Sequence, residues 1–133
     1  MQKSLRSQFI NADNVYQGTT KRVLCVCSAG LLRSPTIANV LQSDYEYNVR
    51  ACGTDPSYAL IPISEVLVEW AHVVVFANKE NYNDVKANYP EALPYVILDL
   101  PDSYGYNDPT LVEIVRRKLK TLHAAGEFDN VRI

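Results

Sequence analysis

The sequence predicts an α/β fold in three layers, a four-stranded parallel sheet flanked by helices on both faces. Short apolar runs and amphipathic segments alternate four times along the chain, which is the pattern of βα units. The most apolar run, residues 72–77, is rich in β-branched residues, as expected of a strand buried on both faces. No repeat or linker interrupts the alternation, so we expect a single domain at residues 21–133 after an N-terminal extension at residues 1–20.

Local signals place the elements along the chain. The first strand is predicted at residues 22–27, and Ser34 and Pro35 predict the next helix, as its cap and its first residue. The remaining elements follow from apolar periodicity and turn residues. They are a strand at residues 47–52, a helix at 64–70, a strand at 72–77, a polar helix at 79–88, a strand at 95–98 and a helix from Asp108 to about Ala124, which Gly126 ends.

Composition and charge argue against several classes of function. The 133 residues carry a net charge of −2, whereas nucleic-acid binding usually requires a basic excess. No run approaches the roughly 18 apolar residues of a membrane span, and the N-terminus lacks the apolar core of a secretory signal. Three cysteines form no disulfide framework, and no Cys-x-x-Cys or histidine cluster indicates a metal site. We therefore expect a cytoplasmic protein with free thiols, no cofactor, and no membrane or nucleic-acid partner.

The segment RVLCVCSAGLLRSP, residues 22–35, predicts an anion site. Cys27 ends a strand, and ligands bind at the carboxyl ends of the strands in parallel sheets. Arg33 and Ser34 open the following helix, where N–H groups and a planar guanidinium favour an anion and stabilise a thiolate. We predict that Cys27 is a nucleophile beneath a bound phosphate. The residues expected to hold that phosphate are Ser28, Ala29, Gly30, Leu31, Leu32, Arg33 and Ser34.

Covalent catalysis through Cys27 also needs a proton donor for the leaving group. The loop DLPDSYGYNDP supplies Asp99, Asp102 and Asp108 at the same expected edge of the sheet. Asp108 is most simply a helix cap, so Asp102 is the predicted general acid by elimination, with Asp99 as the alternative. Three loop tyrosines are candidate walls of a substrate pocket: Tyr58, Tyr104 and Tyr106.

The loop CSAGLLRSP resembles the Cys-x5-Arg-Ser-Pro loop of the low-molecular-weight protein tyrosine phosphatases. Residues 98–113 resemble their late aspartate loop and last helix, in a short form similar to a small bacterial branch of predicted phosphatases. The likeness covers about residues 21–123. It implies the parallel-sheet fold and hydrolysis of phosphotyrosine-like monoesters without a metal or cofactor. By position, Cys27 is the nucleophile, Arg33 binds phosphate and Ser34 stabilises the thiolate.

The chain also departs from the family pattern. Ala29 and Gly30 stand where the family usually has Gly-Asn, so we expect a looser loop, and Leu32 replaces a frequent second cysteine. Pro101-Asp102 stands in place of the usual Asp-Pro, which leaves the acid open between Asp102 and Asp99.

Two rival functions follow from the same residues. The first is a phosphate- or phosphotyrosine-binding module without turnover. The second is arsenate reduction, which would need Cys25 or Cys52 as a disulfide relay; we expect both to be buried core thiols instead. For an enzyme, the expected partner is a phosphotyrosyl protein or a small aryl phosphate. The sequence does not predict an oligomeric state.

Overall fold

A four-stranded sheet forms the centre of the computed structural model, which describes residues 21–28, 33–55, 57, 59, 61–89, 94–101 and 103–129. The N-terminal extension, residues 1–20, lies outside the described residues. The strands are β1 (Arg22–Cys27), β2 (Asn48–Gly53), β3 (Val73–Phe76) and β4 (Tyr95–Ile97). The helices are α2 (Arg33–Tyr45), α3 (Glu65–Trp70), α4 (Lys79–Asn88) and α5 (Pro109–Ala124).

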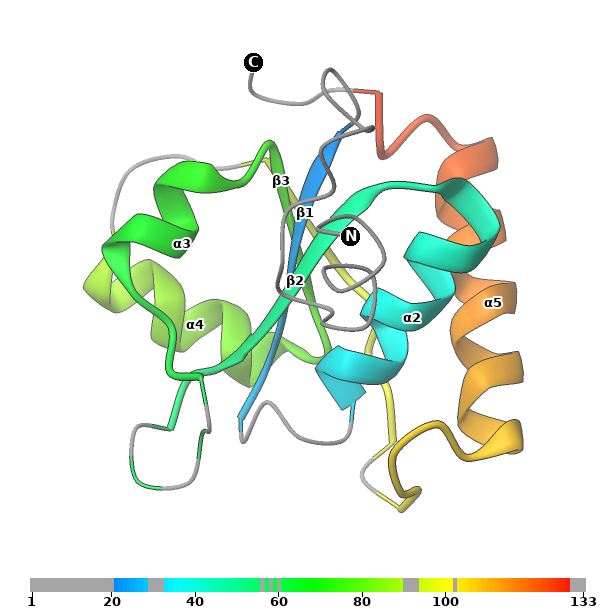
Figure 1. The fold of residues 1–133 in the computed structure, drawn as a ribbon, viewed down its shortest axis with the longest axis horizontal. Helices are drawn as coiled ribbons and strands as arrows, with labels where there is room; N and C mark the ends of the chain where they lie inside the picture. The colour runs from blue at the N-terminus through cyan, green and yellow to red at the C-terminus, as the bar shows by residue number, and fades with distance from the viewer. Residues whose placement is uncertain are drawn as a thin grey trace, which may run out of the picture.

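The elements are arranged in three layers, as the sequence predicts. Helices α2 and α5 lie on one face of the sheet, and α3 and α4 lie on the other (Figure 1). Alternate residues of β1 point to opposite faces. Val23 and Cys25 belong to the apolar cluster beneath α2 and α5, whereas Leu24 and Val26 belong to the cluster beneath α3 and α4. The central strand is therefore apolar on both sides, which explains its continuous run of apolar residues.

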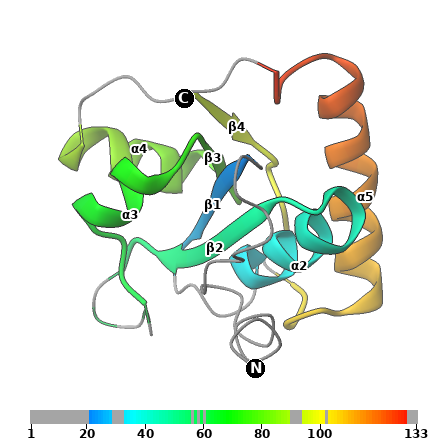
Figure 2. The same cartoon turned by 45° about the horizontal axis from the view of Figure 1, so that its top comes forward.

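The strand order is β2-β1-β3-β4, and all three neighbouring pairs are parallel. Figure 2 shows β1 between β2 and β3. From β1 the chain passes through α2 to β2 on one side, and the later strands build outward on the other side. The connections that follow β1 and β3 therefore diverge at the carboxyl end of β1. In open α/β sheets such a switch point is where ligands bind, and Cys27 is the last residue of β1.

Strands β3 and β4 are shorter than the predicted 72–77 and 95–98, and two boundaries beside Cys27 also differ from the prediction. Helix α2 begins at Arg33, so Ser34 and Pro35 are its second and third residues rather than its cap and first residue. A proline is tolerated there because the first four N–H groups of a helix have no intrahelical partner. Strand β2 lies one residue later than predicted, because it extends to Gly53, which pairs with Cys27.

The other helices agree closely with the predicted positions. Helix α4 spans the predicted residues, and Ser64 caps α3 as expected. Asp108 caps α5, with its side chain accepting a hydrogen bond from Thr110 N. Gly126 follows the end of α5 with φ of 79°, a conformation that favours glycine.

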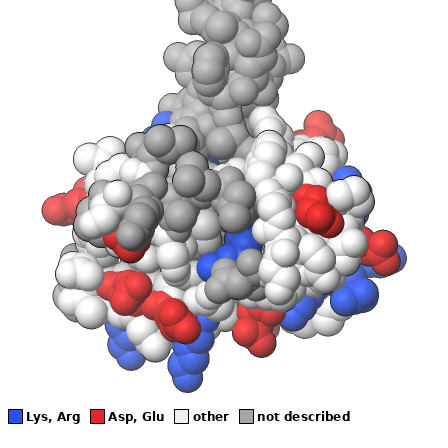
Figure 3. Space-filling model, turned by 90° about the horizontal axis from the view of Figure 1, so that it is seen from below, with Lys and Arg blue, Asp and Glu red and all other residues white. Residues whose placement is uncertain are grey.

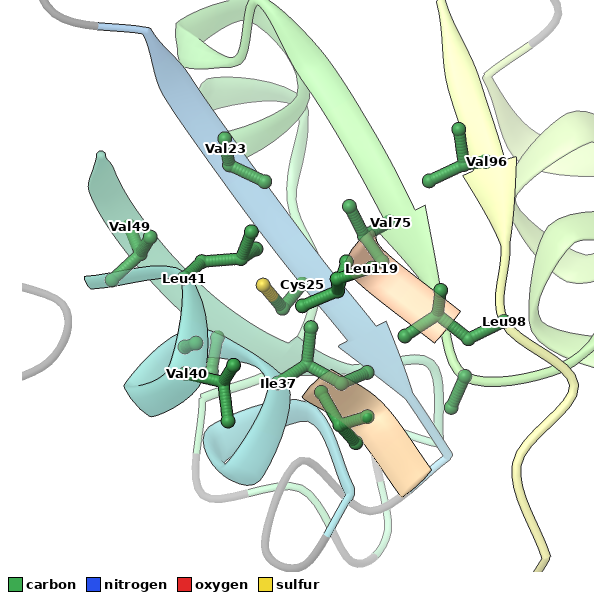
Figure 4. Close-up of a cluster of buried hydrophobic side chains, with 14 of the residues drawn as sticks. Val23, Cys25, Ile37, Val40, Leu41, Val49, Val75, Val96, Leu98 and Leu119 are labelled. Carbon is green, nitrogen blue, oxygen red and sulfur yellow. The ribbon is translucent and has the colours of Figure 1, made fainter. Parts of the chain in front are cut away.

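The cluster beneath α2 and α5 holds most of the large buried side chains and two of the three thiols, Cys25 and Cys27. Figure 4 shows Cys25 pointing from β1 into this cluster, together with Ile37 and Leu41 of α2. All three side chains are fully buried. In the part of the chain that the structure describes, no helix combines the length and apolar character needed to cross a membrane.

Candidate active site

Cys27 is the centre of the candidate site. It is buried at the end of β1, and its Sγ lies 3.2 Å from the Oγ of Ser34, to which the thiol donates a hydrogen bond. The Ser34 hydroxyl in turn donates to the carbonyl of Cys52, also at 3.2 Å. The start of α2 is thus connected both to the candidate nucleophile and to the neighbouring strand β2. This double contact is the physical reason why Ser34 lies inside the helix instead of capping it.

Arg33 connects the start of α2 to the segment that follows β4. It is the first residue of α2 and is only 7% exposed. Its Nη1 donates a hydrogen bond to the carbonyl of Leu100 at 3.3 Å. Leu100 immediately precedes the Pro101-Asp102 pair, so the guanidinium lies next to the loop in which the acid was predicted. At the described positions, the start of this loop therefore lies beside the first residue of α2, while the catalytic roles predicted for Cys27, Arg33 and Asp102 stay predictions.

Ser28, the first residue of the predicted phosphate-binding segment (residues 28–34), is fixed by hydrogen bonds on two sides. On the β2 side, the carbonyls of Cys27 and Ser28 accept hydrogen bonds from the backbone N–H groups of Thr54 and Asp55, each at 2.9 Å. On the β3 side, the Oγ of Ser28 accepts a hydrogen bond from Nδ2 of Asn81 at 3.1 Å. The structure therefore fixes the chain just beyond Cys27, and roles for residues 29–32, outside the described residues, stay predictions.

Asn81 is a site neighbour that the sequence reasoning missed. Its side chain is fully buried in the first turn of α4. A signal for it was present, because Asn78 and Asn81 form an N-cap pattern directly after the most apolar strand, at the carboxyl edge of the sheet.

The loop predicted to carry the general acid, residues 99–109 (the acid loop), is described in part. Asp102 lies outside the described residues, so its assignment stays a prediction. Asp99 is exposed with φ of 59°, and its backbone carbonyl accepts a hydrogen bond from Lys118 Nζ at 3.3 Å. The side chain of Asp108 caps α5, which agrees with its predicted role.

The predicted pocket tyrosines lie in different surroundings. Tyr104 is partly buried against the cluster beneath α2 and α5. Tyr106 is 53% exposed, and its hydroxyl accepts a hydrogen bond from Nδ2 of Asn39 at 2.6 Å. Tyr58 lies outside the described residues. The roles of all three in substrate binding stay predictions.

The other two thiols are core residues, as predicted. Cys25 and Cys52 are both fully buried. Burial raises the pKa of the Cys25 thiol well above its usual value, and burial, with a smaller electrostatic contribution from the nearby Cys27 side chain, raises the pKa of Cys52 to about 12. Both are therefore protonated at neutral pH, a form that is a poor nucleophile and a poor disulfide relay. Among the described residues, no group of three or more His, Cys, Asp or Glu side chains is arranged to hold a metal ion.

Figure 3 views the molecule from the end at which Cys27 lies. It shows a small basic surface near the middle of this face, with acidic side chains and further basic side chains toward its edges.

The comparisons with known proteins concern the fold. No protein-family model and no curated protein matches the chain. The arginine phosphatase YwlE of Geobacillus stearothermophilus is similar in structure, with a TM-score of 0.62 and 15% identity over 85% of this chain and 99% of that chain. The low-molecular-weight protein tyrosine phosphatase of T. tengcongensis has a TM-score of 0.62 and 14% identity over 81% of this chain and 99% of that chain.

A third similar structure is a YwlE mutant in which a serine that replaces a cysteine is phosphorylated at the active site. Its TM-score is 0.54, with 18% identity over 77% of this chain and 95% of that chain. Together these likenesses show that the chain has the fold of the low-molecular-weight phosphatases.

Proposed function

We propose that this protein is a cysteine-dependent phosphatase that hydrolyses phosphotyrosine or other aryl phosphate monoesters. In this proposal Cys27 is the nucleophile, Arg33 binds the phosphoryl oxygens and Asp102 is the general acid. The observation that carries it is that the start of α2, at the switch point of the sheet, contacts Cys27 through Ser34 and the carbonyl of Leu100 through the buried Arg33 guanidinium. The fold shared with known phosphatases supports the same conclusion.

In the first proposed step, the Cys27 thiolate attacks phosphorus in line with the leaving oxygen. A sulfur–phosphorus bond forms, the phosphorus–oxygen bond to the leaving group breaks, and Asp102 donates its proton to that oxygen. Negative charge is spread over the three equatorial oxygens of the phosphoryl group. Arg33 and the N-terminus of α2 are suited to stabilise that charge, because a guanidinium and free helical N–H groups are strong donors to an oxyanion.

In the second proposed step, water attacks the phospho-cysteine. The Asp102 carboxylate, now deprotonated, takes a proton from the water, the sulfur–phosphorus bond breaks, and inorganic phosphate leaves with the Cys27 thiolate restored. The phosphorylated active-site serine of the YwlE mutant supports a covalent intermediate at the equivalent position in this fold.

A second candidate substrate is phosphoarginine. Two structures similar to this chain are described as arginine phosphatases. The first proposed step is the same for a phosphorus–nitrogen bond, with the proton going to the leaving guanidine nitrogen. We favour aryl phosphates because the loop beside Arg33 carries Tyr104 and Tyr106, which are suited to contact an aromatic ring.

The proposal is tested by hydrolysis assays on the purified protein with p-nitrophenyl phosphate, a phosphotyrosine peptide and phosphoarginine. We expect turnover that Cys27→Ser abolishes. Cys25→Ala is the matched control, because Cys25 lies two residues earlier on the same strand and points into the core. It should keep turnover while losing about 1 kcal/mol of stability.

Three other outcomes would contradict the proposal. Turnover that survives in Cys27→Ser would exclude Cys27 as the nucleophile. No turnover by the wild type, together with a thermal midpoint that rises with inorganic phosphate, would show a binding module instead. Arsenate reduction that needs Cys25 or Cys52 would indicate a reductase.

A further inference from the structure

Asn81 is a buried polar side chain at the candidate site that the proposed reaction does not use. Buried amides are normally hydrogen bonded at both ends. The Oδ1 atom of Asn81 accepts a hydrogen bond from the backbone N–H of Asn78 at 3.3 Å. Its Nδ2 atom is 3.1 Å from the Oγ of Ser28. Because the carbonyl end is engaged by an N–H group, the NH₂ end must be the one that donates to Ser28.

The helix cap holds this amide in place. The backbone N–H of Asn81 donates to Oδ1 of Asn78 at 3.2 Å, which completes a reciprocal capping box at the start of α4. Two hydrogen bonds therefore fix the position of Asn81 independently of Ser28. The start of α4 is in turn fixed against β1, because the N–H of Ala77 donates to the carbonyl of Val26 at 2.8 Å. Asn81 thus reaches Ser28 from a rigid support.

The hydrogen bond from Asn81 should affect the loop of residues 28–34 most strongly because it acts at Ser28. The next four residues, 29–32, are Ala, Gly, Leu and Leu, whose side chains can make no hydrogen bond. Within residues 28–34, side-chain hydrogen bonds can therefore come only from the two ends. Ser28 provides them at the start, and Arg33 and Ser34 provide them at the end. The hydrogen bond from Asp55 N fixes the backbone of Ser28 on the β2 side, and Asn81 fixes its side chain on the β3 side.

We propose that Asn81 is a positioning residue, which holds the start of the phosphate-binding segment through Ser28 and so keeps its N–H groups in place for catalysis. The catalytic part of this inference rests on the proposed phosphatase function. Asn81 contacts Ser28 and not the reacting atoms, so its effect on turnover should pass entirely through Ser28. Misplacement of a bound group by about 1 Å can cost up to about 100-fold in rate.

Four variants of the full chain separate this role from a merely structural one. Asn81→Ala removes one capping hydrogen bond and the bond to Ser28. Asn78→Ala removes the other capping hydrogen bond and leaves the bond to Ser28, so it is the matched control. Ser28→Ala removes the hydrogen bond between Ser28 and Asn81 by deleting its acceptor, and it leaves α4 unchanged. The test therefore stays valid if Asn81→Ala folds poorly. The double variant Ser28→Ala/Asn81→Ala measures the coupling.

With p-nitrophenyl phosphate we expect Asn81→Ala and Ser28→Ala each to lower kcat by about 10-fold or more. The inhibition constant of inorganic phosphate should rise with them. Asn78→Ala should stay within about twofold of the wild type, and the double variant should be no slower than Asn81→Ala. Equal losses in Asn78→Ala and Asn81→Ala, or losses that multiply in the double variant, would overturn the inference.

Amide hydrogen exchange decides the structural part whether or not the protein turns over. In the peptide that covers residues 27–33, we expect Asn81→Ala to exchange roughly fivefold faster or more, with no change in Asn78→Ala. Unchanged exchange in Asn81→Ala and Ser28→Ala would overturn the inference even in an active phosphatase. Faster exchange in a protein without any phosphatase activity would instead reject the proposed function and leave Asn81 as the residue that fixes the loop.

Discussion

At the scale of single residues, the most informative contact is the one between Ser34 and Cys27. The Ser34 hydroxyl has one proton, and in this structure it donates that proton to the Cys52 carbonyl while accepting from the thiol. A thiolate has no proton to donate and needs donors instead. Ionisation of Cys27 should therefore turn the Ser34 hydroxyl from Cys52 towards Sγ. In the proposed mechanism, Ser34 therefore stabilises the Cys27 thiolate.

Ser34→Ala should slow turnover because the thiolate loses a charge-assisted hydrogen bond. Such bonds contribute about 1.5–3 kcal/mol, so we expect kcat to fall by about 10-fold or more, most strongly on the acidic side of the pH–rate profile. Ser43→Ala is the control, because Ser43 lies on the same helix with an exposed hydroxyl that donates to Val40. Steady-state kinetics across pH would check this. Equal profiles for the wild type and Ser34→Ala would remove Ser34 from the proposed mechanism.

The choice between two aspartates is also a question of single residues. Asp102→Asn should slow aryl phosphates with poor leaving groups by about 100-fold or more, and activated esters far less, because a good leaving group needs no proton. Asp99→Asn should keep near-normal rates on both. The measurement is a series of phenyl phosphates of increasing leaving-group pKa. The reverse pattern would assign the acid to Asp99.

At the scale of elements, α2 organises both halves of the site. Its first residue, Arg33, contacts the carbonyl of Leu100, and Thr36, one turn later, accepts a hydrogen bond from the N–H of Asn107 at 2.9 Å. Thr36 is fully buried. The same helix therefore forms hydrogen bonds with the acid loop near its beginning, at Leu100, and near its end, at Asn107. Movement of α2 relative to the sheet should therefore displace Arg33 and the residues of this loop together.

Thr36→Val tests this coupling with a side chain of nearly the same shape. It removes the acceptor of the Asn107 N–H, so we expect a loss of about 1 kcal/mol in stability and a several-fold lower kcat with poor leaving groups. Asn39→Ala removes the more exposed contact to Tyr106 and should affect kcat less. Urea unfolding and steady-state kinetics would measure both effects. A normal kcat in a destabilised Thr36→Val protein would show that the acid loop is positioned without Thr36.

At the scale of the whole molecule, a stacked aromatic group closes the end of the structure opposite Cys27. The ring of His123 lies between those of Tyr45 and Phe128, with centroid distances of 3.9 and 4.0 Å. Its Nδ1 is 2.7 Å from the carbonyl of Leu119, and its Nε2 is 2.9 Å from the hydroxyl of Tyr47. A neutral ring satisfies both contacts, with Nδ1–H donating and Nε2 accepting. The group joins α2, α5, the start of β2 and the C-terminal segment.

Burial is the main reason why the pKa of His123 is lowered from its ordinary value. Since the folded pKa lies below that of the unfolded chain, the unfolded chain binds the proton first. Stability should therefore be complete above about pH 6.5 and decrease as the pH falls from there through the folded pKa. His123→Phe should show a smaller decrease in the urea midpoint between pH 7.5 and pH 5. A decrease as large as that of the wild type would assign the acid sensitivity to other groups.

Local patterns in the sequence determined most of the fold. Apolar periodicity and the cap signals at Ser64 and Asp108 depend on neighbouring residues, so they located the strands and helices within one or two residues. The same local pattern made Cys27 and Arg33 the candidate site residues, because a cysteine at the end of a strand and an arginine at a helix start lie close in sequence. The shift of α2 was missed because the Ser34 hydroxyl is engaged by two other strands.

Only the tertiary structure decided which strands are neighbours and what supports the loop. Local periodicity cannot give the order β2-β1-β3-β4, which puts Cys27 between two diverging connections. The Ser28–Asn81 hydrogen bond joins residues 53 positions apart, and the Arg33–Leu100 bond joins residues 67 apart. Such contacts depend on how whole elements pack, because a side chain's own neighbours in sequence do not determine what it meets across the sheet.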